Sequence, residues 1–401
     1  MPQRAPGGFP VVGIIGGGQL ARMCQPPAVA LGLTLSVLAE SEDAAAALVV
    51  PSAPVGDYTD IETVRAFARG CDVVTFDHEH VPAEVLAALE ADGIPLHPSP
   101  GALIFAQDKL AMRVRLGEIG VLCPRWERVV DAAGVQAFGE EVGWPVVAKT
   151  PRGGYDGKGV RLAGSPQDVA DWLGEAARSV GSASGALGSG LLVEERVDFV
   201  REIAVLVARS PSGQAAAWPV VQTVQRNGVC TEVLAPAPDL EPGLAATVTE
   251  AGLRIAGALG VTGVLAVEMF EVRDQRTGEA SYVVNELAMR PHNSGHWTID
   301  GAVTSQFEQH LRAVLDLPLG DPGPHARWTV MANVLGGDYP DLYPAYRHIL
   351  ARDPGLKVHL YGKAVRPGRK VGHVTVSGSR LSGLRERARH AADYLQGTVM
   401  Q

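Results

Sequence analysis

The stretch NELAMRPHNSGHW, residues 285–297, gathers one carboxylate, one arginine, two histidines and two side-chain amides within thirteen residues. It follows the apolar run YVV at residues 282–284, whose composition is typical of a buried strand. A solvated loop has no need of arginine and histidine beside tryptophan. We therefore interpret residues 285–297 as one wall of an active site and expect the other walls elsewhere in the chain.

Two apolar segments on either side of a turn-forming sequence, residues 261–272 and 281–287, predict a β-hairpin. If the hairpin turns about Thr277, Glu268 and Glu286 lie opposite one another, since each is nine residues from the turn. Strand alternation then places both carboxylates on one face, where like charges repel unless a cation bridges them. Oxygen ligands suit Mg²⁺ better than Zn²⁺. A register shift of one residue would instead turn one glutamate to solvent.

The N-terminal part of the chain alternates apolar runs with helical segments. The runs at residues 11–15, 33–39 and 72–76 are typical of buried parallel strands with crossover helices between them. Ligands of such sheets bind beyond the carboxyl ends of the strands. GGGQL at residues 16–20 and DHEH at residues 77–80 both follow a strand, so we expect them to face one pocket.

The glycine-rich sequence GGGQLA at residues 16–21 follows a strand, opens a helix and precedes Glu40, which ends the next strand. By itself this pattern is that of a nicotinamide dinucleotide site, in which Glu40 would bind a ribose. Any phosphate could bind there for the same reason, because glycines admit close backbone approach and a helix N-terminus presents free N–H groups. A tight turn without a ligand remains an alternative.

A second glycine-rich segment, GGYDGKG at residues 153–159, comes soon after Lys149, which closes the apolar strand PVVAK. The segment does not match a Walker loop. Glycine backbone and flanking lysines could cover the phosphates of a nucleoside triphosphate, whereas a plain hairpin turn would leave the lysines solvated. Since Lys149 ends an apolar strand, its ammonium should need an anionic partner.

The formal net charge of -9 excludes a general nucleic-acid binder, so an anionic ligand must meet a local basic cluster. Such a cluster occurs near the C-terminus and is expected to clamp a phosphate rather than form a solvated turn; it contains Lys363, Arg366, Arg369 and Lys370. His78 and His80 share one side of a strand end, but no third metal ligand is evident. Their acidic neighbours are better suited to accept hydrogen bonds from a polar substrate.

The four cysteines, Cys24, Cys71, Cys123 and Cys230, lie far apart and form no CxxC pair. This spacing argues against a zinc site or a disulfide framework and for a reducing cytoplasm. No apolar run is long enough to span a bilayer, so we expect a cytoplasmic protein without a membrane partner.

Together these segments resemble the ATP-grasp ligases and, among them, the N5-carboxyaminoimidazole ribonucleotide synthases. The resemblance covers almost the whole chain. Its most specific parts are NSGHWT at residues 293–298 and RPGRKVGH at residues 366–373, supported by TFDHEHV at residues 75–81 and SQFEQHLRA at residues 305–313. GGGQLARM and KTPRGGYDGKG also match but are generic.

The resemblance implies an α/β and α+β multidomain fold. Residues 1–108 would form an N-terminal Rossmann-like domain with a parallel sheet. Residues 109–318 would form an ATP-grasp domain whose small lid subdomain spans about 145–210, and residues 319–401 a small β-rich C-terminal domain.

ATP and Mg²⁺ are the cofactors that the resemblance implies. Lys109 and Lys149 would reach the phosphates, Glu202 the ribose, and Glu268 and Glu286 the Mg²⁺, with Asn285 beside them. A glycine loop would cover the nucleotide through Gly154, Tyr155, Asp156, Gly157, Lys158, Gly159 and Val160. Backbone groups would hold the adenine at Glu194, Glu195, Arg196 and Val197.

The implied reaction carboxylates 5-aminoimidazole ribonucleotide in purine biosynthesis. Bicarbonate would attack ATP to give carboxyphosphate, which Arg290 and His292 would bind and help to break down. Glu79, Tyr155 and a catalytic Asp156 would contact the aminoimidazole. The ribonucleotide phosphate would be bound by Gly18, Gln19, Leu20, Lys363, Arg366, Arg369 and Lys370. The family also implies a homodimer and a separate mutase that takes the product.

Three positions depart from the family pattern: Gln225 replaces a histidine near the nucleotide, Met289 a proline and Asp77 a glutamate. None removes a charge from the expected phosphate or metal sites. Alternatives from other classes are an NAD-dependent oxidoreductase, which leaves Glu268 and Glu286 unexplained, and a non-catalytic nucleotide-binding module. Another ATP-grasp enzyme, such as a formate-dependent transformylase or a biotin carboxylase, is a further alternative.

Overall fold

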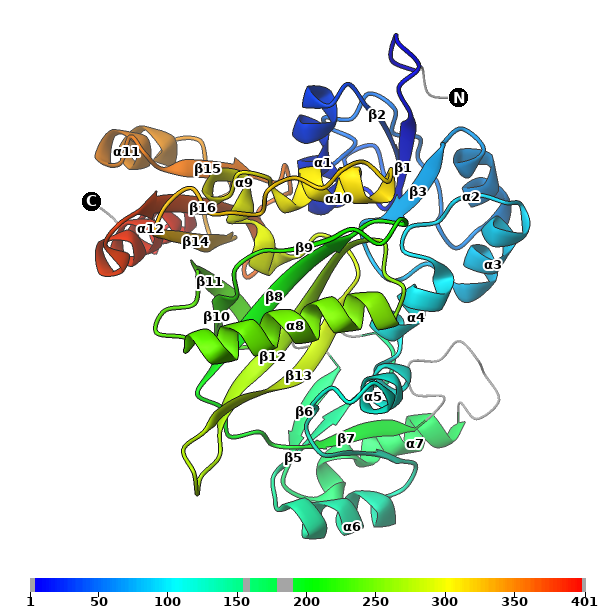
Figure 1. Cartoon of the computed structure of the whole chain (residues 1–401), viewed down its shortest axis with the longest axis vertical. Coiled ribbons are helices and arrows are strands. Elements are labelled where there is room, and N and C mark those ends of the chain that lie inside the picture. Colours follow the sequence, from blue (N-terminus) through cyan, green and yellow to red (C-terminus); the bar gives the residue numbers. More distant parts are fainter. Residues whose placement is uncertain (1–3, 154–158, 179–189, 399–401) are drawn as a thin grey trace.

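The computed structural model describes residues 4–153, 159–178 and 190–398. Within these ranges the strands form three sheets, of three, four and nine strands. Figure 1 shows the three-stranded sheet at the top, the nine-stranded sheet across the middle and the four-stranded sheet at the bottom.

The N-terminal sheet is parallel, with strand order β2-β1-β3, which confirms the predicted Rossmann-like arrangement. All five residues of β1 are buried, because helices cover both of its faces. The strands are β1 (Val11–Ile15), β2 (Thr34–Leu38) and β3 (Val73–Phe76), and the helices are α1 (Gln19–Ala30), α2 (Ile61–Ala68) and α3 (Ala83–Ala91).

Two helices, α4 (Pro100–Gln107) and α5 (Lys109–Glu118), lead out of this unit. Asp108 separates them, because its carboxylate accepts hydrogen bonds from the backbone N–H groups of Leu110 and Ala111 and so caps α5. Lys109 is therefore the first residue of a helix, close to the predicted domain boundary.

The four-stranded sheet has the order β4-β7-β5-β6. This sheet begins with β4, before residue 145, where the lid was predicted to begin. The strand β8 (Arg201–Arg209) lies within the predicted lid range of about 145–210, but it pairs with β12 and β10 of the large sheet. Six consecutive residues of β8 are buried, so this strand needs cover on both faces. The small sheet comprises β4 (Trp126–Val129), β5 (Val146–Lys149), β6 (Val160–Ala163) and β7 (Leu191–Glu195), with η1 (Pro166–Val169), α6 (Ala132–Val142) and α7 (Ala170–Arg178) beside it.

The large sheet carries α8 (Pro242–Ala258) across one face, where it packs on β8 and its neighbours (Figure 1). Its strands follow the order β13-β12-β8-β10-β11-β14-β16-β15, and β9 pairs with β8. The first part consists of β9 (Ala215–Ala217), β10 (Val221–Arg226), β11 (Val229–Ala235), β12 (Gly263–Arg273) and β13 (Ala280–Ala288).

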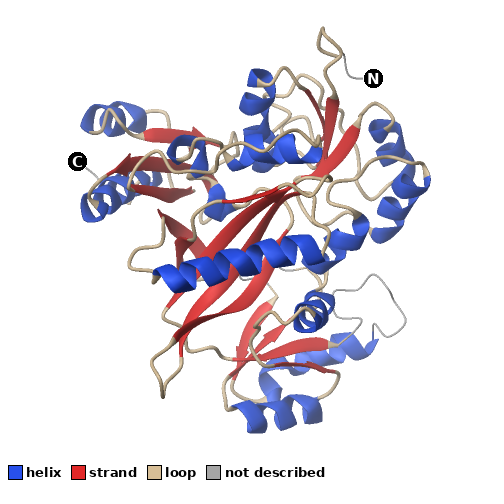
Figure 2. Cartoon of the chain, in the orientation of Figure 1, coloured by secondary structure: helices blue, strands red, loops and turns tan. Residues whose placement is uncertain are grey.

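The C-terminal strands do not form a sheet of their own. β14 pairs with β11, so the predicted β-rich C-terminal part extends the central sheet, with its helices at one end of the molecule (Figure 2). Its elements are β14 (Trp328–Leu335), α11 (Ala345–Arg352), β15 (Lys357–Leu360), β16 (Lys370–Gly378) and α12 (Leu381–Gln396). Among the described residues no helix is both long and apolar enough to cross a membrane.

Helix α10 (Gln306–Val314) joins the N-terminal sheet to the central sheet. Val264 N–H donates to His310 Nδ1 at 3.1 Å, which leaves the ring proton on Nε2 to donate to Thr75 Oγ1 at 2.9 Å. Burial, with a smaller contribution from the charge of His97, lowers the pKa of His310 to about 3. The neutral ring thus links β12 to β3, and it fixes how the two halves of the site face each other.

Candidate active site

A cavity of about 2000 Å³ lies between the units and receives side chains from all of them. The segments after β1 and β3 form one wall, the small sheet a second, and the ends of β12 and β13 a third. The sequence-predicted residues along it are Gln19, Leu20, Glu79, Lys109, Lys149, Val160, Glu194, Glu195, Arg196, Val197, Glu202, Glu268, Asn285, Glu286, Arg290, His292, Lys363, Arg366, Arg369 and Lys370.

A few predicted residues are not part of this lining. Gly18 and Gly159 lie next to lining residues but do not line the cavity themselves. Gly154, Tyr155, Asp156, Gly157 and Lys158 lie outside the described residues, so their proposed roles remain predictions from sequence.

Glu268 and Glu286 are paired across β12 and β13, as predicted. The pairing arises differently from the prediction, which assumed one regular hairpin that turns about Thr277; the register changes within the two strands. The outer register, Met269 with Val284, would continue to pair Glu268 with Asn285. A β-bulge between Glu268 and Met269 shifts the ladder by one residue and so brings Glu286 opposite Glu268.

Each of these glutamates also has a basic neighbour. His292 Nε2 lies 2.9 Å from Glu268 Oε1, and Lys109 Nζ lies 3.4 Å from Glu286 Oε1. Burial is the largest single effect on Glu268 and raises its pKa, but the contact with His292 and the charges of Lys370 and Arg290 together leave that pKa below its ordinary value. Two carboxylates that lie side by side in this way suit a divalent cation that also binds phosphate oxygens.

No cluster of three or more His, Cys, Asp or Glu side chains among the described residues could hold a metal ion alone. Glu268 and Glu286 would therefore hold Mg²⁺ together with substrate phosphates, since Mg²⁺ is commonly bound by one or two carboxylates and phosphate oxygens.

Lys149 has the anionic partner that its apolar strand predicts. Its Nζ lies 2.7 Å from Glu194 Oε2 and donates to Asn285 Oδ1 at 3.0 Å. The Glu194 side chain also contacts Arg113, a buried residue that sequence reasoning missed. The available signal was spacing, because Arg113 follows Lys109 by four residues and therefore shares its helix face.

Arg290 is held by Glu79 from the opposite wall, with 2.8 Å between Nε and Oε1. Burial is the largest single effect on Glu79 and raises its pKa, but the charge and hydrogen bond of Arg290, with smaller contributions from the backbone and His80, together keep that pKa below its ordinary value. The two residues belong to the segments after β3 and β13, so this ion pair closes the cavity between the N-terminal and central sheets.

The Gly16–Leu20 loop is fixed by carboxylates of its own unit. Gly17 N–H donates to Glu40 Oε2 at 3.0 Å, and Ala21 N–H donates to Asp77 Oδ1 at 2.7 Å. A Cβ at Gly18 would lie 2.0 Å from Asp77 Oδ2, so glycine is needed for this approach. Glu40 thus holds the loop itself through one of its carboxylate oxygens.

The C-terminal basic segment faces the same loop. Lys363 Nζ donates to Gln19 Oε1, and Arg366 and Arg369 are exposed along the cavity. Gly368 has a φ of +75°, which a glycine adopts without strain and which turns the segment back toward Gly336. The predicted phosphate-binding groups of the two ends of the chain are therefore brought together.

Glu202 lies beside Gln225, the residue that departs from the family pattern. Burial and then the charge of Glu268 raise the pKa of Glu202 to about 7, against hydrogen bonds from Gln225 and Thr223. Both residues line the cavity and belong to neighbouring strands of the large sheet, β8 and β10.

The segment NSGHW acquires a physical role in the structure. Gln306 accepts from His292 N–H and donates to His292 O, both at 2.8 Å, and it also donates to His296 Nδ1 at 2.9 Å. Asn293 and Asn333 exchange two hydrogen bonds, of 2.9 and 2.8 Å. These contacts fix the backbone of His292, whose ring faces Glu268.

Family models match three consecutive parts of the chain. A ribonucleotide synthetase preATP-grasp domain matches residues 10–107, an ATP-grasp domain residues 114–307, and a phosphoribosylaminoimidazole carboxylase C-terminal domain residues 329–387. The N5-carboxyaminoimidazole ribonucleotide synthase of Mycobacterium tuberculosis (strain H37Rv) is 54% identical over 389 residues, which cover 96% of this chain and 88% of the relative. The chain belongs to the N5-carboxyaminoimidazole ribonucleotide synthase family.

Other members of the family extend the match. The synthase of Corynebacterium ammoniagenes is 48% identical over 396 residues, 98% of this chain and 94% of the relative. The solved synthase of Aspergillus clavatus in complex with ADP and 5-aminoimidazole ribonucleotide has a TM-score of 0.83 and 30% identity, covering 97% of this chain and 99% of that one. The predicted family, multidomain fold and class of ATP-dependent ligase are thereby confirmed.

Proposed function

We propose that this ATP-dependent ligase carboxylates 5-aminoimidazole ribonucleotide to N5-carboxyaminoimidazole ribonucleotide, with bicarbonate as the source of carbon. The observation that supports the proposal is that Arg290 and His292 line one cavity together with two groups of candidate anion-binding residues. On one side lie the carboxylate pair and two lysines. On the other lie the glycine loop and the basic segment.

The nucleotide site is proposed along the small sheet. Lys109 and Lys149 would neutralise the phosphates, because phosphoryl transfer needs positioning and positive charge more than covalent chemistry. Glu202 would accept from the ribose hydroxyls. Backbone groups of Glu194, Glu195, Arg196 and Val197 would hold the adenine, and Gly159 and Val160 would border the phosphates.

Glu268 and Glu286 would hold Mg²⁺, which supplies charge neutralisation at the phosphates when it is bound. His292 Nε2 keeps Glu268 in place, and Lys109 does the same for Glu286. Both carboxylates are thus oriented before the nucleotide arrives.

Arg290 and His292 would act on the labile intermediate. Bicarbonate attacks the γ-phosphorus and ADP leaves, which gives carboxyphosphate; its breakdown releases CO₂ and phosphate. The Arg290 guanidinium offers donors to those anionic oxygens, and His292 carries a proton on Nε2, because Nδ1 accepts from Ser294 N–H at 3.3 Å. The exocyclic amine of the ribonucleotide then captures CO₂ and loses a proton.

The ribonucleotide site is proposed on the opposite wall. Gln19, Leu20, Lys363, Arg366, Arg369 and Lys370 would bind its phosphate, with Gly18 as the approach that lets Asp77 fix the loop. Glu79 would face the aminoimidazole, together with Tyr155 and Asp156.

The test is ADP release by the purified protein with and without each substrate. We expect release to require both bicarbonate and the ribonucleotide, and Glu286→Ala to abolish it, whereas Glu84→Ala, an exposed carboxylate on the same cavity rim, should retain it. ADP release that ignores the ribonucleotide would refute the proposal. Replacing bicarbonate by formate, or the ribonucleotide by biotin, tests the other ATP-grasp activities.

We also propose a cytoplasmic homodimer whose product passes to a separate mutase, in line with the family. Four cysteines without a disulfide among the described residues are consistent with a reducing compartment. Sedimentation at micromolar concentration tests the dimer.

A further inference from the structure

Four side chains from four different elements form a closed ring behind the proposed nucleotide site. Arg113 Nε on α5 lies 2.6 Å from Glu194 Oε1 on β7, and Glu194 Oε2 lies 2.7 Å from Lys149 Nζ on β5. Lys149 donates to Asn285 Oδ1 on β13, and Arg113 Nη2 donates to Asn285 O at 2.8 Å. The ring therefore joins the small sheet, α5 and the edge of the central sheet.

The ring is buried and carries an excess of positive charge. The Arg113 side chain is 0% exposed and that of Glu194 is 3% exposed. Two cations share one carboxylate, so one positive charge is left over where Lys149 reaches the cavity. A buried charge is costly unless it is paired. The excess is relieved when an anion, such as a nucleotide phosphate, lies beside Lys149.

Arg113 also stabilises the bulge in β13. The register shift falls at Asn285, whose carbonyl accepts from Arg113, and the preceding Val284 N–H donates to Leu122 O at 2.8 Å. Without the bulge, the outer register would pair Glu286 with Val267 and turn it to the face opposite Glu268. The contact from Arg113 to Asn285 thus favours the register that brings the two carboxylates together.

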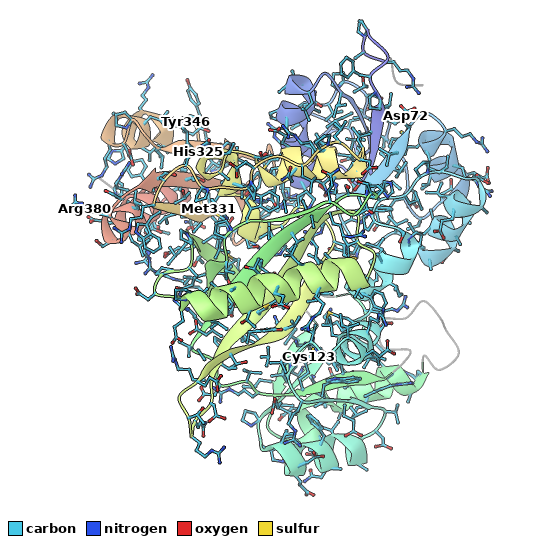
Figure 3. All side chains as sticks on the ribbon, in the orientation of Figure 1. Asp72, Cys123, His325, Met331, Tyr346 and Arg380 are labelled. Atoms are coloured by element: carbon cyan, nitrogen blue, oxygen red, sulfur yellow. The ribbon has the colours of Figure 1, made fainter. Side chains whose placement is uncertain are left out.

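We propose that Arg113 is a positioning residue that holds Lys149 and the Glu268–Glu286 pair in place at the same time, by joining Glu194 to the bulged Asn285. The inference rests on the proposed roles of Lys149, Glu268 and Glu286. Only an arginine has a planar fork that donates to a carboxylate and to a backbone carbonyl at once. Cys123, labelled in Figure 3, marks the place, since Arg113 Nη1 lies 3.8 Å from its sulfur.

The experiment compares Arg113→Met and Arg113→Lys with the wild type. Binding of ATP with Mn²⁺ is measured by calorimetry, and bound Mn²⁺ by electron paramagnetic resonance, without bicarbonate or ribonucleotide. We expect affinity for the metal–nucleotide complex to fall about 10- to 100-fold in Arg113→Met, as for other residues that orient a ligand set. Arg113→Lys should recover thermal stability but not this affinity.

Arg115→Met is the matched control, because Arg115 lies on the same helix and pairs with Glu118 at the surface. It should bind like the wild type. The double variant Arg113→Met with Lys149→Met should lose less affinity than the product of the two single losses, since Arg113 acts through Lys149.

Wild-type affinity in Arg113→Met, full recovery by lysine, or independent effects of Arg113 and Lys149 would each overturn the inference. The binding assay uses neither bicarbonate nor ribonucleotide. A failure of the inference is therefore distinct from a failure of the proposed carboxylation, which would show as absent ribonucleotide-dependent ADP release in the wild type.

Discussion

Glu79 Oε1 lies 2.8 Å from Arg290 Nε, although the two residues are more than two hundred positions apart in the chain. Glu79 follows the last strand of the N-terminal sheet, and Arg290 follows the edge strand of the central sheet. The pair connects the proposed ribonucleotide wall with the group proposed to bind carboxyphosphate.

We predict that Glu79→Gln lowers kcat/KM for the ribonucleotide about 10- to 100-fold, because a charge-assisted contact of roughly 1.5–3 kcal/mol is lost. Binding of MgATP should change less than twofold, since Glu79 is not part of the nucleotide wall. Steady-state kinetics and calorimetry measure the two quantities. Glu84→Gln is the control, and equal losses in both quantities would contradict the assignment of Glu79.

Arg369→Ala should raise KM for the ribonucleotide about tenfold and leave MgATP binding nearly unchanged. One charge-assisted contact to a phosphate accounts for an effect of this size. Arg380→Ala removes an arginine from the C-terminal end of the molecule (Figure 3), away from the cavity lining, and should have no effect. If Arg369→Ala weakened both ligands equally, the separation into two anion sites would be wrong.

Gly295→Ala should destabilise the protein by about 1–3 kcal/mol and reduce kcat, because overpacking forces neighbours to move. The added Cβ would lie 2.3 Å from Leu206 Cδ2 and 2.4 Å from Gln306 Oε1, the atom that holds His292 N–H. Gly383→Ala on α12, where a Cβ meets no atom within 4 Å, should be neutral or slightly stabilising. Denaturant unfolding and ADP release provide the measurements, and an undisturbed Gly295→Ala enzyme would show that the hydrogen bonds with Gln306 do not position His292.

The low pKa of the buried His310 predicts that the protein loses stability in mild acid. Its pKa of about 3 in the folded state is below the ordinary 6.5, so the unfolded chain binds a proton that the folded chain does not. The contribution of His310 to the free energy of unfolding is fully present well above pH 6.5 and is lost progressively as the pH decreases toward 3. At 1.36 kcal/mol per pKa unit, His310 alone accounts for about 2 kcal/mol between pH 6.5 and pH 5.

Urea unfolding at pH 7.5 and pH 5 measures this slope in the wild type and in His310→Gln. The difference between the free energies of unfolding at the two pH values should be smaller in the variant by about 2 kcal/mol, whatever the absolute stability of the variant. An unchanged slope would mean that the ring is already charged in the folded protein.

Much of the architecture followed from local pattern. Apolar runs that end in glycine or in charged residues predicted β1, β3 and β5 within one or two residues, because such runs are stable only as buried strands. The continuity of the central sheet through β14 was not predictable, since strand pairing between β11 and β14 depends on contacts about a hundred residues apart. The pairing of β8 with β10 and β12 rather than with the small sheet was not predictable for the same reason.

Most residues predicted for the site line one cavity, but the contacts between them were not predictable. Lys149 required an anion because an apolar strand ends there, but no local rule indicated Glu194 rather than a phosphate as its partner. The sequence indicated Arg113 only through its spacing of four residues from Lys109, because an arginine on a helix is usually solvated. Its burial became visible once α5 packed against the edge of β13.

The sequence by itself determined which chemical groups are present and the expectation that Glu268 and Glu286 face each other across a hairpin. It also indicated the family, through the resemblance carried above all by NSGHWT and RPGRKVGH. The tertiary structure decided how that pairing arises: a bulge at Asn285, supported by Arg113, moves Glu286 to the face of Glu268. Periodicity specifies alternation along a strand, whereas a bulge is stable only when another part of the chain satisfies the backbone group that leaves the ladder.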